Sequence, residues 1–227
     1  MKLNALIAGG LLCLLPCLAV ARQPQQTPEP AAKKNARPAG EAEDKAEPFD
    51  KMTPEQMSGR CVTLETEAGD IVIEVLSEAA PESARNFLNL ASLGFFDTTT
   101  FSRVVKDFVV QGGNVMTRET VTPDLIRRAS RKVPDEPNPV KHLRGVVSLA
   151  RPAEANAATT HFFILLNDSP HLDGTFAAFG RVRSGMEAVD KIAAGEVEGE
   201  KPKNPVRIRR ATVARCQPPA PAQPPKQ

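Results

Sequence analysis

Apolar and polar residues alternate over much of the middle of the chain. Val62, Leu64 and Thr66 alternate with polar positions, residues 68–70 carry a turn sequence, and residues 71–75 alternate again. A period of two is typical of strands with one buried face, so these residues predict a β-hairpin. Further short strands are predicted at residues 100–105, 108–111, 146–150, 162–165, 177–182 and 206–215.

Two segments have helical spacing instead. Residues 81–94 begin with Pro81, whose missing N–H is harmless in the first helical turn, and they end with Gly94. Between these two residues the apolar side chains recur every three or four positions. A second helix is predicted over residues 186–193. Many short strands and two helices favour a mainly β fold, a closed antiparallel barrel capped by the helices.

The first 21 residues have the features of a secretory signal peptide. Lys2 gives a positive start, residues 3–18 are almost entirely apolar, and residues 19–21 (Ala-Val-Ala) offer a cleavage site. A membrane anchor is the alternative, but Pro16 interrupts an apolar run that is shorter than the roughly 20 residues needed to cross a bilayer. A lipoprotein signal is disfavoured because neither nearby cysteine follows a small residue. We therefore expect a periplasmic or secreted protein, with no stable membrane insertion after cleavage.

Shifts in composition divide the rest of the chain. Residues 22–58 are dominated by Pro, Ala, Glu, Gln and Lys and contain few large apolar side chains. Such a segment cannot offset its ordering entropy by burial, so it is predicted to be a disordered linker. Residues 217–227 form a shorter proline-rich tail that is also predicted to be disordered. The folded domain is therefore expected over residues 59–216.

Charge and residue spacing exclude some classes of function. The formal net charge of +2 speaks against a nucleic-acid-binding protein. A basic run at residues 127–132 is a candidate surface for acidic polypeptides or anionic lipid, with an ordinary solvated loop as the alternative. His142, His161 and His171 lack the spacing of metal ligands, so neither a metal nor a cofactor is expected.

Three local sequences carry a resemblance to a known family. They are FSRVVKDFVVQGGN at residues 101–114, GVVSLAR at 145–151 followed by THFFI at 160–164, and LDG at 172–174 followed by FGRV at 179–182. In this order and spacing they resemble the signatures of the cyclophilin-type peptidyl-prolyl cis-trans isomerases. The resemblance runs over about residues 62–213. Within the family, the sequence most resembles the bacterial periplasmic branch.

The resemblance implies a closed eight-stranded antiparallel β-barrel capped by two α-helices, with a hydrophobic groove for proline on its outer face. It also implies an enzyme, a monomeric peptidyl-prolyl cis-trans isomerase that acts as a folding catalyst on exported proteins. Its substrates would be proline-containing polypeptides, and no cofactor is needed because no bond is cleaved. The alternative is a non-catalytic prolyl-peptide-binding module or a holdase chaperone.

The chemistry explains why an arginine belongs in such a site. Rotation about an X–Pro bond must break amide resonance, at a cost of about 18–20 kcal/mol. The planar fork of an arginine can hydrogen-bond the prolyl nitrogen as that atom pyramidalises. By resemblance the catalytic residue is Arg103. The substrate-binding residues implied in the same way are Phe108, Val109, Gln111, Arg151 (through its main chain), Phe163, His171, Leu172 and Phe176.

The groove departs from the pattern of many family members. His171 stands where many carry tryptophan, Phe176 where many carry histidine, and one extra residue lies between Ala150 and Phe163. We expect catalysis to be retained because the arginine and the other groove residues remain. Cyclosporin should bind weakly, because an imidazole replaces the indole N–H that would donate a hydrogen bond to it.

A disulfide is the last expectation. After removal of the signal peptide, Cys61 and Cys216 are the only two cysteines. In the barrel that the resemblance implies, Cys61 begins the first strand, Cys216 ends the last, and these strands are antiparallel neighbours. An exported protein meets an oxidising compartment, so we expect the two cysteines to pair. Two unpaired cysteines are the alternative.

Overall fold

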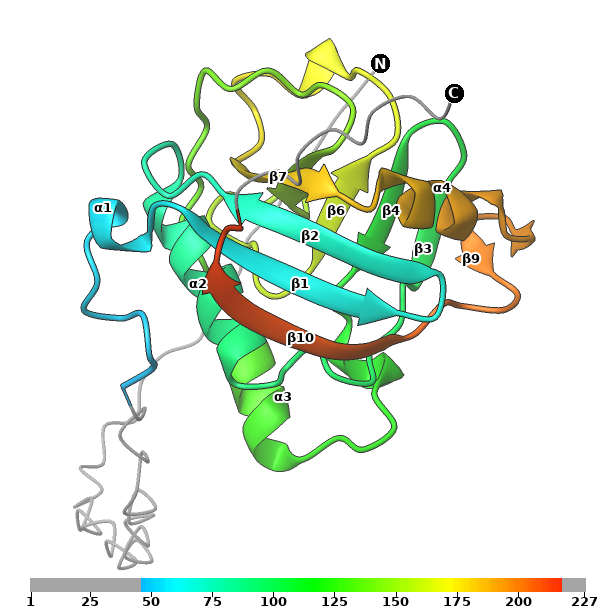
Figure 1. Ribbon diagram of the computed structural model, residues 1–227, viewed down its shortest axis with the longest axis horizontal. Coiled ribbons are helices and arrows are strands. Elements are labelled where there is room, and N and C mark those ends of the chain that lie inside the picture. The colour runs from blue at the N-terminus through cyan, green and yellow to red at the C-terminus, as the bar shows by residue number, and fades with distance from the viewer. Residues whose placement is uncertain (1–45, 218–227) are drawn as a thin grey trace, which may run out of the picture. The chain divides into compact units, whose positions relative to one another are not determined.

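Eight strands form one antiparallel sheet that curls around the core. The computed structural model describes residues 46–217; residues 1–45, which hold the predicted signal peptide and most of the predicted linker, and residues 218–227 lie outside the described residues. The strand order is β10-β1-β2-β7-β5-β6-β4-β3. Figure 1 shows β10, β1 and β2 side by side at the front of the sheet. The predicted mainly β, eight-stranded antiparallel fold is confirmed.

The elements have the following bounds. The strands of the large sheet are β1 Arg60–Thr66, β2 Gly69–Val75, β3 Arg103–Val105, β4 Val109–Gly112, β5 Val146–Leu149, β6 Phe162–Leu165, β7 Ala178–Ser184 and β10 Ile208–Arg215. A separate two-stranded hairpin consists of β8 Val197–Glu198 and β9 Lys201–Pro202. The helices are α1 Pro54–Met57, α2 Pro81–Ser92, α3 Pro123–Ala129 and α4 Met186–Ala194, with 3₁₀ turns η1 Val115–Thr117 and η2 Pro170–Leu172. None of the helices within residues 46–217 has the length and apolar character needed to cross a membrane.

The first hairpin shows why alternation predicted the strands correctly. Val62 lies opposite Ile73, and Leu64 lies opposite Ile71. All four side chains are fully buried in the core inside the curled sheet. The polar residues between them point to the other face, as the pleat of a strand requires.

Helix α2 supplies the centre of the core. It packs against β7 and β10, and its bounds lie close to the predicted residues 81–94. Phe87 contacts three other rings, with centroid distances of 5.2 Å to Phe96, 5.3 Å to Phe162 and 4.9 Å to Phe179. Tilted and edge-on pairs at these distances are favourable beyond the area that they bury. The helix therefore covers one opening of the curled sheet through a cluster of phenylalanines.

The barrel closes through an irregular segment, because β3 and β10 are at the two ends of the strand order. The Thr98 N–H donates to the Ile208 carbonyl at 2.8 Å, and the Ile208 N–H donates to the Thr99 carbonyl at 2.8 Å. The Phe101 N–H donates to the Val206 carbonyl at 3.0 Å. These bonds join the chain just before β3 to the start of β10, so closure does not depend on a continuous ladder between the two strands.

The predicted disulfide is present. Cys61 and Cys216 are bonded, with their Cα atoms 4.9 Å apart across a sequence separation of 155. Strands β1 and β10 are antiparallel neighbours with Arg60 opposite Arg215, which brings the two cysteines to the same end of the pair. The Cys216 N–H also donates to the Gly59 carbonyl at 2.9 Å.

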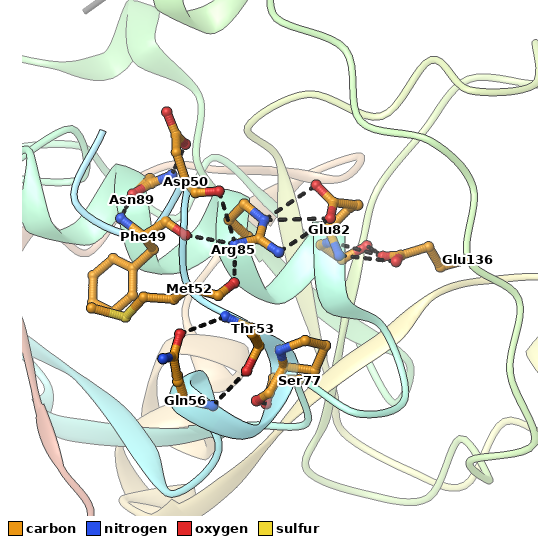
Figure 2. A network of polar contacts seen from close by, with 12 residues as sticks. Phe49, Asp50, Met52, Thr53, Gln56, Ser77, Glu82, Arg85, Asn89 and Glu136 are labelled. Atoms are coloured by element: carbon orange, nitrogen blue, oxygen red, sulfur yellow. Dashed lines mark hydrogen bonds and ion pairs between the residues drawn. The ribbon is translucent and has the colours of Figure 1, made fainter. Parts of the chain in front are cut away.

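The N-terminal segment, residues 46–58, packs on the domain. Phe49 is 4% exposed and Met57 is fully buried. Figure 2 shows how the segment is bound: Nη1 of Arg85, on α2, donates to the carbonyls of Phe49 and Met52, both at 2.6 Å. Asn89, one turn further along α2, accepts from the Phe49 N–H at 2.8 Å. The prediction that the disordered linker extends to residue 58 is therefore wrong for residues 46–58.

The cations of the basic run after η1 are paired with carboxylates. Much of it belongs to α3, and a carboxylate of the N-terminal segment, Glu47, pairs with both Arg128 and Arg131. The remaining pairs are Arg127 with Asp124 at 3.0 Å and Lys132 with Glu154 at 3.1 Å. Each cation of the run thus has an acidic neighbour. The ion pairs agree with the alternative of an ordinary solvated surface, and attraction of acidic polypeptides or anionic lipid stays a prediction.

Candidate active site

Three of the predicted site residues are cross-strand neighbours on β3, β4 and β6. Arg103 lies opposite Gln111, and Gln111 lies opposite Phe163. Directly paired residues point to the same face of a sheet, so the three side chains form a row across the strands. Their neighbours in sequence, such as Val104 and Ile164, belong to the core inside the sheet. The row therefore lies on the outer face, where the resemblance placed the groove.

A second apolar cluster covers this outer face. Its buried members are Val109, Val146, Phe163, Leu165, Leu172 and Ala178, with Val105, Phe108, Val140, Ala150 and Phe176 packed against them. Phe163 and Phe176 make an edge-on pair with ring centroids 5.9 Å apart. Phe108 and His171 lie with ring centroids 5.6 Å apart. Phenylalanines from β6 and from the loops after β3 and η2 thus meet in one cluster.

The predicted groove residues differ in how far they reach the surface. Phe108 and Phe176 are half-buried and His171 is exposed, so these rings are accessible to a ligand. Phe163 and Leu172 are 6% and 7% exposed. Val109 is almost fully buried, so it supports the floor of the cluster from below and offers little contact area of its own.

The loop that carries His171, Leu172 and Phe176 is anchored through Asp173. The Asp173 carboxylate accepts the His142 N–H at 2.8 Å and pairs with the Lys141 ammonium at 3.1 Å. The main-chain hydrogen bond from His142, followed by the hydrogen bond from Lys141, lowers the pKa of Asp173 to about 2. This carboxylate is therefore ionised at neutral pH and ties η2 to the segment before β5.

Arg103 is the centre of the polar contacts at the edge of the predicted groove. Its Nη1 donates to Oε1 of Gln111 at 3.3 Å, which agrees with their pairing across β3 and β4. Its Nε and Nη2 donate to the two carboxylate oxygens of Glu200 at 2.6 and 3.0 Å. The hydrogen bonds from Arg103 lower the pKa of the Glu200 carboxyl below its usual value. Sequence reasoning missed Glu200, because it lies 97 residues from Arg103 and no motif marks it.

A depression of about 320 Å³ opens beside Arg103. It is lined by Arg103, Gln111, Ala150, Arg151, Pro152, Ala157, Thr159 and His161. Burial lowers the pKa of His161, which favours its neutral imidazole. The depression is lined by both polar and apolar side chains, and Ala150 belongs both to its lining and to the apolar cluster. His161 belongs to the THFFI motif at residues 160–164 but was not predicted as a site residue.

The side chain of Arg151 folds back on the rim of the groove. Its guanidinium lies 5.1 Å from the centroid of the Phe176 ring, and its Nε is 3.5 Å from Oδ1 of Asp135. A cation over an aromatic face and a nearby carboxylate both hold the side chain in place. This arrangement fixes the wall formed by Phe176. Within residues 46–217 no group of His, Cys, Asp and Glu side chains is placed to hold a metal ion.

Comparison with known proteins identifies the family. The family model described as cyclophilin type peptidyl-prolyl cis-trans isomerase/CLD matches residues 61–213. This chain is a member of that family. The peptidyl-prolyl cis-trans isomerase cypE of Dictyostelium discoideum is 36% identical over 159 residues, covering 69% of this chain and 99% of that protein. Peptidyl-prolyl cis-trans isomerase A of Dickeya dadantii is 34% identical over 165 residues, covering 67% of this chain and 83% of that protein.

Solved structures agree on the fold. A cyclophilin-type isomerase of Cryptosporidium parvum, crystallised in the presence of the dipeptide Ala-Pro, has a TM-score of 0.59 to this chain. It is 24% identical in sequence, and the match covers 68% of this chain and 98% of that one. The chain is thus a cyclophilin by sequence and by fold, and a peptidyl-prolyl cis-trans isomerase by the names that the family and its members carry.

Proposed function

We propose that this cyclophilin accelerates rotation about X–Pro bonds in exported polypeptides, with Arg103 as the catalytic residue. The observation that carries the proposal is the place of Arg103, whose side chain is 37% exposed at the edge of the apolar cluster around Phe163. Gln111 separates the two residues in the row across the strands. A proline ring seated on Phe163 would bring the bond that precedes it within reach of the guanidinium.

The chemistry requires preferential stabilisation of the twisted amide. In the planar amide the prolyl nitrogen shares its lone pair with the carbonyl group, whereas in the twisted transition state the lone pair returns to the nitrogen. An N–H of Arg103 can then donate to that nitrogen, an interaction that the ground state cannot make. Each ~1.4 kcal/mol of such selective stabilisation accelerates the rotation tenfold.

The other groove residues hold the substrate. The apolar side chains of Phe163 and Leu172, with the rings of Phe108 and Phe176, bind the pyrrolidine ring by burying its surface. Gln111 hydrogen-bonds the substrate backbone, and the main chain of Arg151 pairs with the residue that precedes proline. The Cryptosporidium structure was determined in the presence of the dipeptide Ala-Pro, which is consistent with this class of substrate.

Two features support export as part of the proposal. Residues 1–21 have the sequence of a signal peptide, although they lie outside the described residues. The Cys61–Cys216 disulfide favours an oxidising compartment, because cytosolic thiols are kept reduced. We propose a periplasmic or secreted monomer of the bacterial periplasmic branch, which acts on proline-containing polypeptides, binds no nucleic acid and does not stay inserted in a membrane.

The catalytic proposal is tested with a proline tetrapeptide and the purified protein. We expect Arg103→Ala to lower kcat/KM at least about tenfold with an unchanged melting temperature, and Arg103→Lys to restore little because it lacks the planar fork. Arg209→Ala, an exposed arginine on β10, is the matched control. Wild-type turnover by Arg103→Ala contradicts the proposed role, and peptide binding without any acceleration indicates a non-catalytic binding module.

The export proposal has a separate test. The gene is expressed with its own N-terminus in a Gram-negative host, and the protein is recovered from the periplasm or the medium. Mass spectrometry should find a mature chain that begins at Arg22. Retention of an uncleaved chain in the cytosol contradicts export while leaving the isomerase activity untouched.

A further inference from the structure

The hairpin β8–β9 brings a carboxylate to the edge strand that carries Arg103. Strand β3 is at one end of the strand order, so its outer edge is free of a full strand partner. The Val104 N–H on that edge donates to the Glu200 carbonyl at 2.8 Å. This main-chain bond fixes Glu200 beside β3. At the base of the hairpin, Lys203 bonds Glu196 through both its N–H at 2.9 Å and its ammonium at 3.0 Å.

The contact between the two side chains is bidentate and leaves one end of the guanidinium open. Nε and Nη2 of Arg103 use one N–H each on Glu200, and Nη1 uses one N–H on Gln111. Because a guanidinium carries five N–H groups in one plane, Nη1 and Nη2 each keep one further donor. A carboxylate on the Nε side and an amide on the Nη1 side together fix the orientation of that plane.

We propose that Glu200 is a positioning residue for Arg103 in the isomerase reaction. The inference rests on the proposed catalytic role of Arg103. Glu200 holds the guanidinium in the rotamer that presents its remaining donors to the groove, so the arginine does not have to be ordered as the transition state forms. Donors that are already oriented cost no reorganisation at the moment of reaction.

The exposure of the pair indicates where its effect should appear. The Arg103 and Glu200 side chains are 37% and 55% exposed, and ion pairs as open as this contribute little to folding stability. A purely structural salt bridge at this place would therefore have little consequence of any kind. A positioning role predicts that removal of the Glu200 carboxylate lowers turnover and leaves the melting temperature unchanged. This combination distinguishes a positioning role from a purely structural one.

The test uses Glu200→Ala, Glu200→Gln and a matched control in the same hairpin. Glu198→Ala removes the same charge from an exposed residue whose main chain pairs with Lys201. Turnover is measured by NMR exchange on a proline peptide with the purified protein. We expect Glu200→Ala to lower kcat about fivefold, equivalent to about 1 kcal/mol, with KM within about twofold of wild type. The kcat of Glu200→Gln should lie between those of wild type and Glu200→Ala. The kcat of Glu198→Ala should equal that of wild type.

A double-mutant cycle shows whether Glu200 acts through the arginine. In the Arg103→Ala background, Glu200→Ala should have no further effect, because the group that it positions is absent. The Nε–H signal of Arg103 in a ¹H–¹⁵N spectrum gives an independent measure, and it should broaden in Glu200→Ala but stay sharp in Glu198→Ala.

Three outcomes overturn the inference. The first is equal turnover of Glu200→Ala and Glu198→Ala, and the second is an undiminished effect of Glu200→Ala in the Arg103→Ala background. The third is a rise in turnover, which would mean that the carboxylate competes with substrate for Arg103. If wild type and Arg103→Ala have equal rates, the proposed catalytic role itself has failed, so the two failures are distinguishable.

Discussion

His171 lies beside Phe108 at one end of the groove, with ring centroids 5.6 Å apart and ring planes inclined by 35°. By the family resemblance, His171 stands where many cyclophilins carry tryptophan, and its imidazole packs on the phenylalanine that is expected to contact proline. An imidazole has a smaller apolar surface than an indole, and it has no N–H group as far from the backbone as the indole N–H.

The first prediction concerns this substitution. His171→Trp should strengthen cyclosporin binding at least about tenfold over wild type, because it supplies one hydrogen-bond donor and more apolar area. Isothermal titration calorimetry measures both affinities. Leu93→Trp places the same residue on an exposed site at the end of α2 and should leave the affinity unchanged. Tight binding by the unmodified protein contradicts the prediction.

The second prediction concerns the hydrogen bonds of Arg85 to the N-terminal segment. Arg85→Ala should lower the free energy of unfolding by about 2 kcal/mol, because two main-chain carbonyls lose a charged donor. Urea denaturation measures the loss. Arg127→Ala removes an exposed arginine from an i,i+3 pair and should cost less than about 0.5 kcal/mol. Equal stability of the two variants would show that the Arg85 hydrogen bonds do not stabilise the segment.

A third prediction follows from the disulfide. The chain-entropy model gives about 5 kcal/mol for a closed loop of this length, so reduction should lower the free energy of unfolding by about 2–5 kcal/mol. The measurement is urea denaturation with and without a reductant. The double variant Cys61→Ala/Cys216→Ala should unfold at the same urea concentration whether or not reductant is present. Turnover should persist in reduced protein, since β1 and β10 remain paired by their backbone ladder.

The fourth prediction uses the pH dependence of Asp173. Its pKa is lowered from 3.8 to about 2, so its stabilising effect is fully present above pH 3.8 and is lost as the pH falls through about 2. Asp173→Asn should therefore melt at a lower temperature than wild type at pH 7. The difference should narrow below pH 3.8 and close below about pH 2. Asp124→Asn, at a carboxylate that is 81% exposed, is the control and should melt close to wild type at pH 7.

Local sequence patterns predicted the elements whose stability is local. The alternation around Val62 and Ile73 depends on residues that are close in sequence. The same holds for α2, which begins at a proline and is followed closely by a glycine. The site residues Arg103, Gln111 and Phe163 were predicted because they belong to family motifs, and their pairing on adjacent strands explains why the motifs have that spacing.

The missed features depend on contacts between residues far apart in the chain. Phe49 and Met57 are isolated apolar residues in a polar stretch, and nothing nearby indicates that Arg85 and Asn89 will bind the backbone around Phe49. Glu200 is one of several acidic residues in its region of the sequence. Only the packing of its hairpin against β3 places it beside Arg103. No local sequence pattern indicates such long-range contacts.

The disulfide between Cys61 and Cys216 also determines how the domain responds to mechanical force. A pull on the two chain ends would first peel residues 46–58 away from α2 and would then meet the covalent link between Cys61 and Cys216. Beyond that point the tension passes through the link and leaves the intervening strands unloaded. Strands β3, β4 and β6, with the groove that they carry, would stay folded while the ends are under force.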